Sequence, residues 1–467
     1  MRQNVNKNIA LLAMLLCTVP IALLAQQPKI SNLRAYDKTG INVFETPKND
    51  TVPFNGMKLR FGAGFTQQFQ NLKDQNPGAL DNNVGSYSAT SPVAGNKLIP
   101  LTPGFQTAMA NLFMDVQLAA GIRMNVTSYL STKHHNETWV KGGYIQFDKI
   151  PIKCKIIDQI MQYTTIKVGH MEINYGDEHF RRSDGGQTLY NPFMENYIMD
   201  EFATEIGGEV YVQKNGIFGM IGVSNGQIKG NVDSFYNAAH VTQPIDPSIY
   251  LKAGIDKQVA KKIRLRFSAS YYENRSCPSN TLFGGDRSGS NYQFVMEENS
   301  ANQSSTTGAG TGLAFSGRFN PGFTNRISTY MLNGFAKISG FEFFGTYENA
   351  EGRTVNETSD RQATQYAVEG VYRFNVLGGS ENIFLGVRYN SVTARLANSS
   401  AGTGAGPITY TGDVTVNRVA FAGGWFLTKN ILLKGEYVIQ KYLDFPTADY
   451  RAGGKFDGYV VEAIVGF

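Results

Sequence analysis

The chain has 467 residues and a formal net charge of +5 at pH 7, with 17% charged and 12% aromatic residues and a mean hydropathy of −0.25. This hydropathy excludes a bundle of membrane-spanning helices, and the aromatic content argues against a disordered chain, because aromatic residues supply surface to bury. The basic residues are scattered, so the sequence predicts no nucleic-acid partner. Abundant glycine, tyrosine and phenylalanine with few charges favour an all-β protein with many turns.

Residues 1–25 predict a secretory signal peptide. A positively charged start, a short apolar run and Ala25 at its end are the features that such a signal requires. The apolar run is short for a membrane-spanning helix. We therefore expect residues 26–55 to form a segment on the periplasmic side and residues 56–467 to form the folded domain.

Alternation of apolar and polar residues recurs through the rest of the chain, for example from Ile263 to Tyr271. A period of two places alternate side chains on opposite faces of a sheet. Many runs approach the roughly 9–11 residues that a tilted transmembrane strand needs. The predicted strands are 57–69, 109–120, 121–131, 137–148, 161–171, 203–213, 217–226, 249–260, 262–273, 325–338, 341–349, 363–375, 382–393, 413–426, 430–441 and 456–467.

Short turns and long polar loops alternate between these strands, as they do in bacterial outer-membrane barrels. The last predicted strand places Tyr459, Val461, Val465 and the terminal Phe467 on one face. A terminal phenylalanine on such a strand is typical of barrels that are handed to the barrel-assembly machinery. The sequence thus predicts an all-β fold, a transmembrane antiparallel β-barrel of about 16 strands in a Gram-negative outer membrane.

The stretch from Glu172 to Phe202 follows the fifth predicted strand and is the densest charged segment of the chain. A loop inside a water-filled lumen can keep its charges hydrated, so we expect a constriction loop here. Two alternatives remain: an acid/base group made by Asp177, Glu178 and His179, or a solvated surface loop. The chain carries no nucleophile signature of the G-x-S-x-G kind, which disfavours catalysis.

Side chains of this loop and inward positions of the strands are the expected pore-lining residues, since charged rings set the size and charge selectivity of pores. We expect no catalytic residue, metal ligand or cofactor. The candidate pore-lining residues are Asp177, Glu178, His179, Arg181, Arg182, Asp184, Arg60, Arg264, Arg266, Arg373, Arg388 and Glu436.

Parts of the sequence resemble a known family. Residues 168–185, together with Asn191-Pro192-Phe193, residues 205–211 and the early segment 37–45, are similar to the phosphate-selective porins and DcaP-like trimeric porins. The resemblance implies a sixteen-stranded barrel, a homotrimer and passive uptake of small, often anionic, solutes. Because the candidate lumen cations alternate with acidic residues, general porin function carries over rather than phosphate specificity.

The functional hypothesis is an outer-membrane porin that forms a water-filled channel for passive diffusion of small hydrophilic solutes, including anionic ones. The alternatives are a structural or adhesive barrel and a barrel enzyme. Expected partners are outer-membrane lipid, the solutes, the assembly machinery through Phe467 and two further copies in a homotrimer. Whether Cys154 and Cys277 pair stays open, because two cysteines make no disulfide framework.

Overall fold

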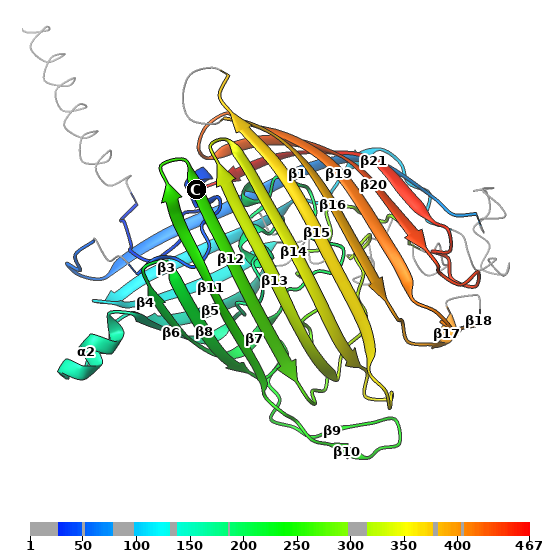
Figure 1. Ribbon diagram of the computed structural model, residues 1–467, viewed down its shortest axis with the longest axis horizontal. Helices are drawn as coiled ribbons and strands as arrows, with labels where there is room; N and C mark the ends of the chain where they lie inside the picture. Colours follow the sequence, from blue (N-terminus) through cyan, green and yellow to red (C-terminus); the bar gives the residue numbers. More distant parts are fainter. Residues whose placement is uncertain are drawn as a thin grey trace, which may run out of the picture.

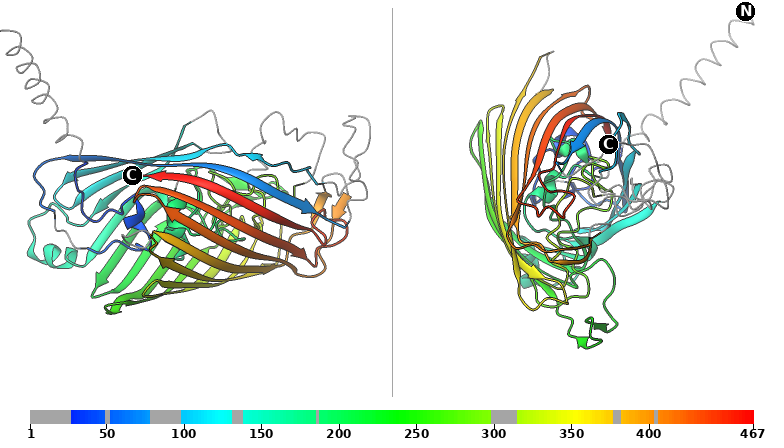
Figure 2. Two further views of the ribbon diagram at one scale, coloured as in Figure 1. Left: turned by 90° about the horizontal axis from the view of Figure 1, so that it is seen from above. Right: turned by 90° about the vertical axis from the view of Figure 1, so that its right-hand side faces the viewer.

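A computed structural model describes residues 27–48, 52–77, 98–130, 138–184, 187–297, 315–376, 382–402 and 406–467. The expected signal peptide, residues 1–25, lies outside these described residues. The described chain is dominated by long strands that close into one barrel, seen from the side in Figure 1 and nearly end-on in the right panel of Figure 2.

Sixteen strands form the barrel wall in the described part of the chain. They are β1 (Lys58–Gln75), β3 (Met109–Ala119), β4 (Ile122–Leu130), β5 (Trp139–Phe147), β6 (Thr164–Glu172), β7 (Thr204–Lys214), β8 (Ile217–Ser224), β11 (Ser248–Ala260), β12 (Ile263–Asn274), β13 (Arg326–Ile338), β14 (Phe341–Arg353), β15 (Arg361–Phe374), β16 (Ile383–Ala394), β19 (Val414–Phe426), β20 (Ile431–Leu443) and β21 (Lys455–Gly466).

Each strand pairs antiparallel with its neighbours along the chain, and β1 closes the ring by pairing with β21. The closing register sets Phe65 opposite Val465 and Gln68 opposite Glu462. Closure leaves no free strand edge, so every wall segment has its backbone hydrogen bonds satisfied by neighbouring strands, as a membrane-spanning sheet requires.

The remaining elements are short and lie in connections. Of the helices in the described residues, none is long and apolar enough to cross a membrane. These elements are η1 (Lys38–Gly40), α2 (Lys155–Met161), η2 (Glu178–Arg181), η3 (Thr188–Tyr190), β2 (Gly104–Phe105), β9 (Phe235–Tyr236), β10 (Thr242–Gln243), β17 (Ser399–Gly402) and β18 (Gly406–Ile408).

The predicted sixteen-stranded barrel is confirmed, and each predicted strand corresponds to one barrel strand. The largest differences fall at strand ends: β1 continues to Gln75 rather than 69, and β14 continues to Arg353 rather than 349. Both extensions lie at the long-loop end, where polar side chains replace the apolar alternation that marks the membrane-facing part of a strand.

The outward face of the barrel is apolar and the inward face is polar. On β15 the outward Val368 is 58% exposed, whereas the inward Gln365 and Glu369 are 0% and 4% exposed. The same alternation on β21 leaves Val461 outside and Glu462 inside. A closed sheet with an apolar outer face and polar interior is suited to a bilayer and not to water.

Aromatic side chains gather at both ends of this outer face. At the short-turn end Phe341 lies 4.4 Å from Tyr372 between ring centroids, and toward the long-loop end Tyr330 lies 6.2 Å from Tyr347. All four rings are exposed. Two such girdles flank the apolar band of outer-membrane barrels, where amphipathic rings sit at the level of the lipid headgroups.

Short turns cluster at the barrel end that also holds the C-terminus, and long loops cluster at the other end (Figure 2). The turn between β7 and β8 uses Asn215 and Gly216 with φ of 52° and 78°. Positive φ at both central residues is the geometry of a tight two-residue hairpin turn, for which Asn-Gly is the favoured pair. The long connection between β6 and β7 forms no such tight turn.

Candidate functional site

The connection between β6 and β7 folds into the barrel interior. Its charged residues Asp177, Glu178, Arg181, Arg182 and Asp184 are each at most 2% exposed. Burial of this many charges is costly unless each finds a partner. The interior supplies those partners from the strands, from the N-terminal segment and from the long connection between β12 and β13.

One set of partners joins the loop to β15 and β16. Arg181 Nη1 lies 2.7 Å from a carboxylate oxygen of Glu369, and Arg388 Nε donates to the other oxygen of the same carboxylate at 2.7 Å. Arg388 also donates to the backbone carbonyl of Glu195 at 2.6 Å. Glu369 thus holds a loop cation and a wall cation together, and we call Arg181, Glu369 and Arg388 the wall clasp.

A second set joins the loop to the connection between β12 and β13. Arg182 contacts Asp184 at 2.6 Å and Asp200 at 2.9 Å. Arg318, which follows the undescribed part of that connection, contacts the same Asp200 at 2.9 Å and Glu195 at 2.9 Å. Two inward-folded segments therefore share their acidic residues, and each stabilises the position of the other.

A third set joins the loop to the N-terminal segment and to β11 and β12. Asp177 lies 2.8 Å from Lys252 and 2.7 Å from Arg266, and Glu45 contacts the same two cations. Burial alone would raise the pKa of Asp177, but Lys252 and Arg266 outweigh burial and hold that pKa well below its usual range. The same cations lower the pKa of Glu45 to about 2 against the effect of burial, so both carboxylates stay ionised.

Side chains of the wall also satisfy the backbone of the loop. Glu436 accepts a hydrogen bond from the Met194 amide at 2.9 Å, and Asn390 accepts one from the Ile198 amide at 2.7 Å. Lys434 donates to the carbonyl of Phe193 at 2.8 Å. A loop inside a barrel has no neighbouring strand, so these inward polar residues take the place of a sheet ladder.

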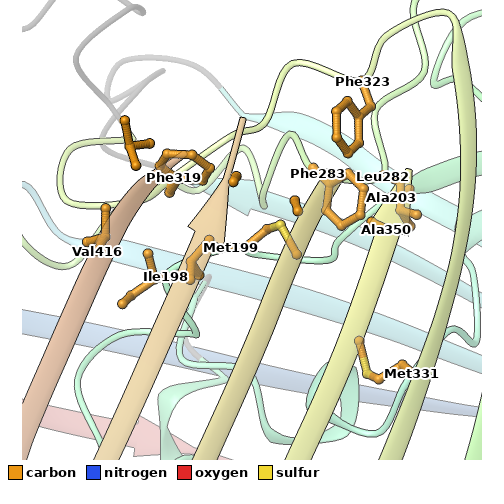
Figure 3. Packing of buried hydrophobic residues seen from close by; sticks show 14 of the residues in the cluster. Ile198, Met199, Ala203, Leu282, Phe283, Phe319, Phe323, Met331, Ala350 and Val416 are labelled. Atoms are coloured by element: carbon orange, nitrogen blue, oxygen red, sulfur yellow. The ribbon is translucent and has the colours of Figure 1, made fainter. Parts of the chain in front are cut away.

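Apolar packing fills the side of the lumen toward β13 to β19. Figure 3 shows Ile198 and Met199 of the loop beside Phe319, Leu282 and Phe283 of the other inward-folded connection. Each of these side chains is at most 4% exposed. In the described chain, these contacts join the two inward-folded connections through apolar side chains.

The opposite side of the lumen, along β4 to β7, holds three adjoining cavities. A cavity of about 180 Å³ reaches Gln213 near the short-turn end, and one of about 220 Å³ reaches Thr127 on β4. A third, of about 120 Å³, includes Tyr129 and Thr204 near the long-loop end. Neighbouring cavities share lining residues, so together they follow the inner wall from one barrel end toward the other, and we call them the side passage.

The middle cavity of the side passage carries more positive than negative side chains. Arg34, Lys141 and Lys167 line it, and among the described lining residues Glu172 is the one that is acidic. Lys141 is paired with Asp286. Lys167 lies 5.1 Å from the ring centres of both Tyr144 and Tyr211 and forms no ion pair in the described chain.

His179 lies between the loop and the passage with both ring nitrogens engaged. Its Nε2 lies 2.7 Å from Asn174 Oδ1, and its Nδ1 lies 3.6 Å from Glu172. Burial lowers its pKa despite the neighbouring Glu172, so the ring is neutral at pH 7. Among the described residues no hydroxyl or thiol is hydrogen-bonded to this ring, and no group of three His, Cys, Asp or Glu residues is placed to hold a metal ion.

Of the predicted pore-lining residues, only His179 is among the residues that line the side passage in the described chain. The two loop arginines pair with Glu369, Asp184 and Asp200. The other predicted residues make interior contacts with further partners: Arg60 with Asp115, Arg264 with Asp256, Arg266 with Asp177, Arg373 with Glu342, Arg388 with Glu369, and Glu436 with Met194 and Tyr292.

Several residues that line the passage were not predicted. Lys141 and Lys167 lie on the inner faces of β5 and β6, where the alternation of these predicted strands offered a usable signal. Arg34 comes from the segment before the first strand, where no periodic pattern exists to place it. Its position follows from contacts between residues far apart in the chain.

The closed barrel, the apolar outer band with its aromatic girdles and the inward-folded loop define an outer-membrane β-barrel with a porin-like architecture. No family model matches the chain, and no curated protein matches its sequence.

Solved structures with a similar fold include the anion-selective porin from Comamonas acidovorans, at a TM-score of 0.49 and 9% identity over 88% of this chain and 99% of that one. The outer-membrane channel DcaP of Acinetobacter baumannii is similar at a TM-score of 0.47 and 10% identity, over 89% and 99% of the two chains. OmpT, an outer membrane protein of Vibrio cholerae, has a TM-score of 0.46 and 9% identity, over 89% and 99%. At this level the likeness concerns the fold alone.

Proposed function

We propose that this barrel is a non-catalytic diffusion channel for small hydrophilic solutes and that the side passage is its route. The observation that carries the proposal is the row of cavities along β4 to β7, beside the apolar packing toward β13 to β19. The loop between β6 and β7 narrows this route through His179 and Phe180, beside Glu172 at the end of β6, while its arginines hold it in place.

We further infer a preference for anions in the middle of the passage. Arg34 and Lys167 form no ion pair in the described chain and face the carboxylate of Glu172 there, while Lys141 is paired with Asp286. Charges in a narrow, partly dehydrated passage act on a passing ion more strongly than charges in open water do. Chloride should therefore pass more readily than potassium.

The proposal is tested by planar-bilayer conductance of the purified protein with single cysteines introduced. In a background with Cys154→Ser and Cys277→Ala, Thr127→Cys places a thiol in the middle cavity. Thr346→Cys places a matched thiol at a buried position of β14 that lines none of the three cavities. A bulky charged thiol reagent should reduce the conductance of the first variant and leave the second unchanged.

One result would contradict the channel function, and a different result would contradict the proposed route. Absence of any conductance would remove the channel function and favour a structural or adhesive barrel. Conductance that responds to modification at position 346 but not at 127 would place the route elsewhere.

The expected partners are also proposals. The exposed apolar band supports contact with outer-membrane lipid, and the exposed side chain of Phe467 supports recognition by the barrel-assembly machinery. The homotrimer implied by the sequence resemblance is tested by the mass of the detergent-solubilised complex.

A further inference from the structure

The segment before the first strand lies at the short-turn end and packs into the barrel. Phe44 is 2% exposed, and its ring centre lies 5.7 Å from that of Phe180 and 5.5 Å from that of Phe335. Tyr36 stacks on Phe113 at 4.0 Å. Figure 2 shows this dark-blue stretch at the same barrel end as the C-terminus.

Polar contacts fix the same segment at several points around the wall. Glu45 reaches Lys252 at 3.1 Å and Arg266 at 2.8 Å, on β11 and β12. Tyr36 donates to Asp115 on β3 at 3.0 Å, and Lys48 donates to the Asp148 carbonyl at 2.9 Å. These contacts reach strands on different sides of the barrel, so the segment is fixed inside it. We call residues 27–48 the inner wall.

Arg34 is the residue of this inner wall that reaches the side passage, and it lines both larger cavities. Its Nε donates to the Gly40 carbonyl and its Nη1 to the Phe180 carbonyl, each at 2.7 Å. Its guanidinium lies 3.8 Å from the ring centre of Tyr190. In the described chain it forms no ion pair, and its buried Nη2 has no hydrogen-bond partner.

We propose that residues 27–48 form the second wall of the passage, opposite the barrel strands, and that Arg34 is a specificity-determining residue for anionic groups there. This inference rests on the channel proposed above. Two backbone carbonyls and one aromatic face hold the guanidinium, so it is oriented before a solute arrives. The Nη2 donors remain for a carboxylate or phosphate oxygen, and Lys167 lines the same cavities as a second cation.

Arg34 is a better candidate for binding an anionic group than the other cations of the passage, because those cations have acidic partners or neighbours. Lys141 is already bound to Asp286. Lys167 has Glu209 as its cross-strand neighbour, although that carboxylate accepts hydrogen bonds from Tyr211 and the Asn174 amide. Arg34 forms no ion pair in the described chain, and Glu172, which lines the same cavities, acts on its charge only at longer range.

The test compares Arg34→Gln with Lys29→Gln in planar bilayers under a potassium chloride gradient, and again with potassium acetate. Lys29 carries the same charge on the same segment but is exposed and lines none of the three cavities. Arg34→Gln should lower the anion-to-cation permeability ratio by at least about twofold for both salts. Lys29→Gln should leave the ratio at the wild-type value.

Two further measurements distinguish a direct effect of Arg34 on ion selectivity from release of residues 27–48 from the barrel. They are the selectivity of Arg34→Lys and the rate of trypsin cleavage after Lys38. We expect Arg34→Lys to keep the anion preference with Lys38 still protected. An unchanged ratio in Arg34→Gln, in a channel that conducts normally, would overturn the inference and leave the channel proposal intact. Loss of the anion preference in both Arg34→Gln and Arg34→Lys, together with cleavage at Lys38, would also overturn the inference. Release of the segment from the barrel would then be the cause.

Discussion

The wall clasp makes a quantitative prediction about how the loop is held inside the barrel. Glu369 accepts from Arg181 and from Arg388 at 2.7 Å each, with all three side chains buried. Glu369→Gln keeps the shape of the side chain and removes the charge. It leaves two buried guanidinium groups without their shared carboxylate.

Removing one partner of a buried ion pair costs about 3–5 kcal/mol, because the remaining charge is uncompensated. Glu178, whose carboxylate lies 3.8 Å from Arg388, can ionise and replace part of the lost charge. We therefore expect the lower end of this range. At about 1.4 kcal/mol for each factor of ten, the population with the loop released should rise by about 150-fold.

Trypsin cleavage after Arg181 and Arg182 measures that population in the folded barrel, since both arginines are buried when the loop is docked. When opening and closing are faster than cleavage, the cleavage rate follows the released fraction. Glu351→Gln on the exposed face of β14 is the matched control and should cleave at the wild-type rate. Equal cleavage rates for Glu369→Gln and wild type would refute the clasp.

Two further predictions concern the outer face and the pH dependence. Val461→Arg places a charge on the outward face of β21 and should destabilise the barrel by about 2–4 kcal/mol. The control Val376→Arg, just beyond the end of β15, should destabilise it far less. The measurement is the temperature at which the gel mobility of the protein changes, and equal shifts for the two variants would contradict the assignment of the lipid face. Burial raises the pKa of Glu178 to about 8, so its contribution to stability is complete below pH 4.5 and is lost as the pH rises through 8. Glu178→Gln should therefore flatten the stability profile between pH 5 and 9, as followed by the same gel assay, and an unaltered slope would show that Glu178 is ionised throughout.

Local sequence was sufficient for the barrel wall. Side chains alternate with a period of two whatever the strand pairs with, so apolar residues at 366, 368 and 372 on β15 specify the outward face without any tertiary information. Strand length and the alternation of short and long connections then specify a membrane barrel rather than a soluble sandwich. The charged loop after the fifth strand was also visible, because its composition differs so sharply from the strands around it.

Only the tertiary structure decided what the interior does. Contacts such as Arg181 with Glu369 and Glu45 with Arg266 join residues about two hundred positions apart in the chain, and no local pattern encodes such a pairing. A buried charge must find its partner wherever the fold places one, so the loop arginines turned toward the wall and away from the passage. The segment before the first strand lies inside the barrel for the same reason. The interior offers two carbonyls and an aromatic face to the guanidinium of Arg34, which therefore lies beside the cavities.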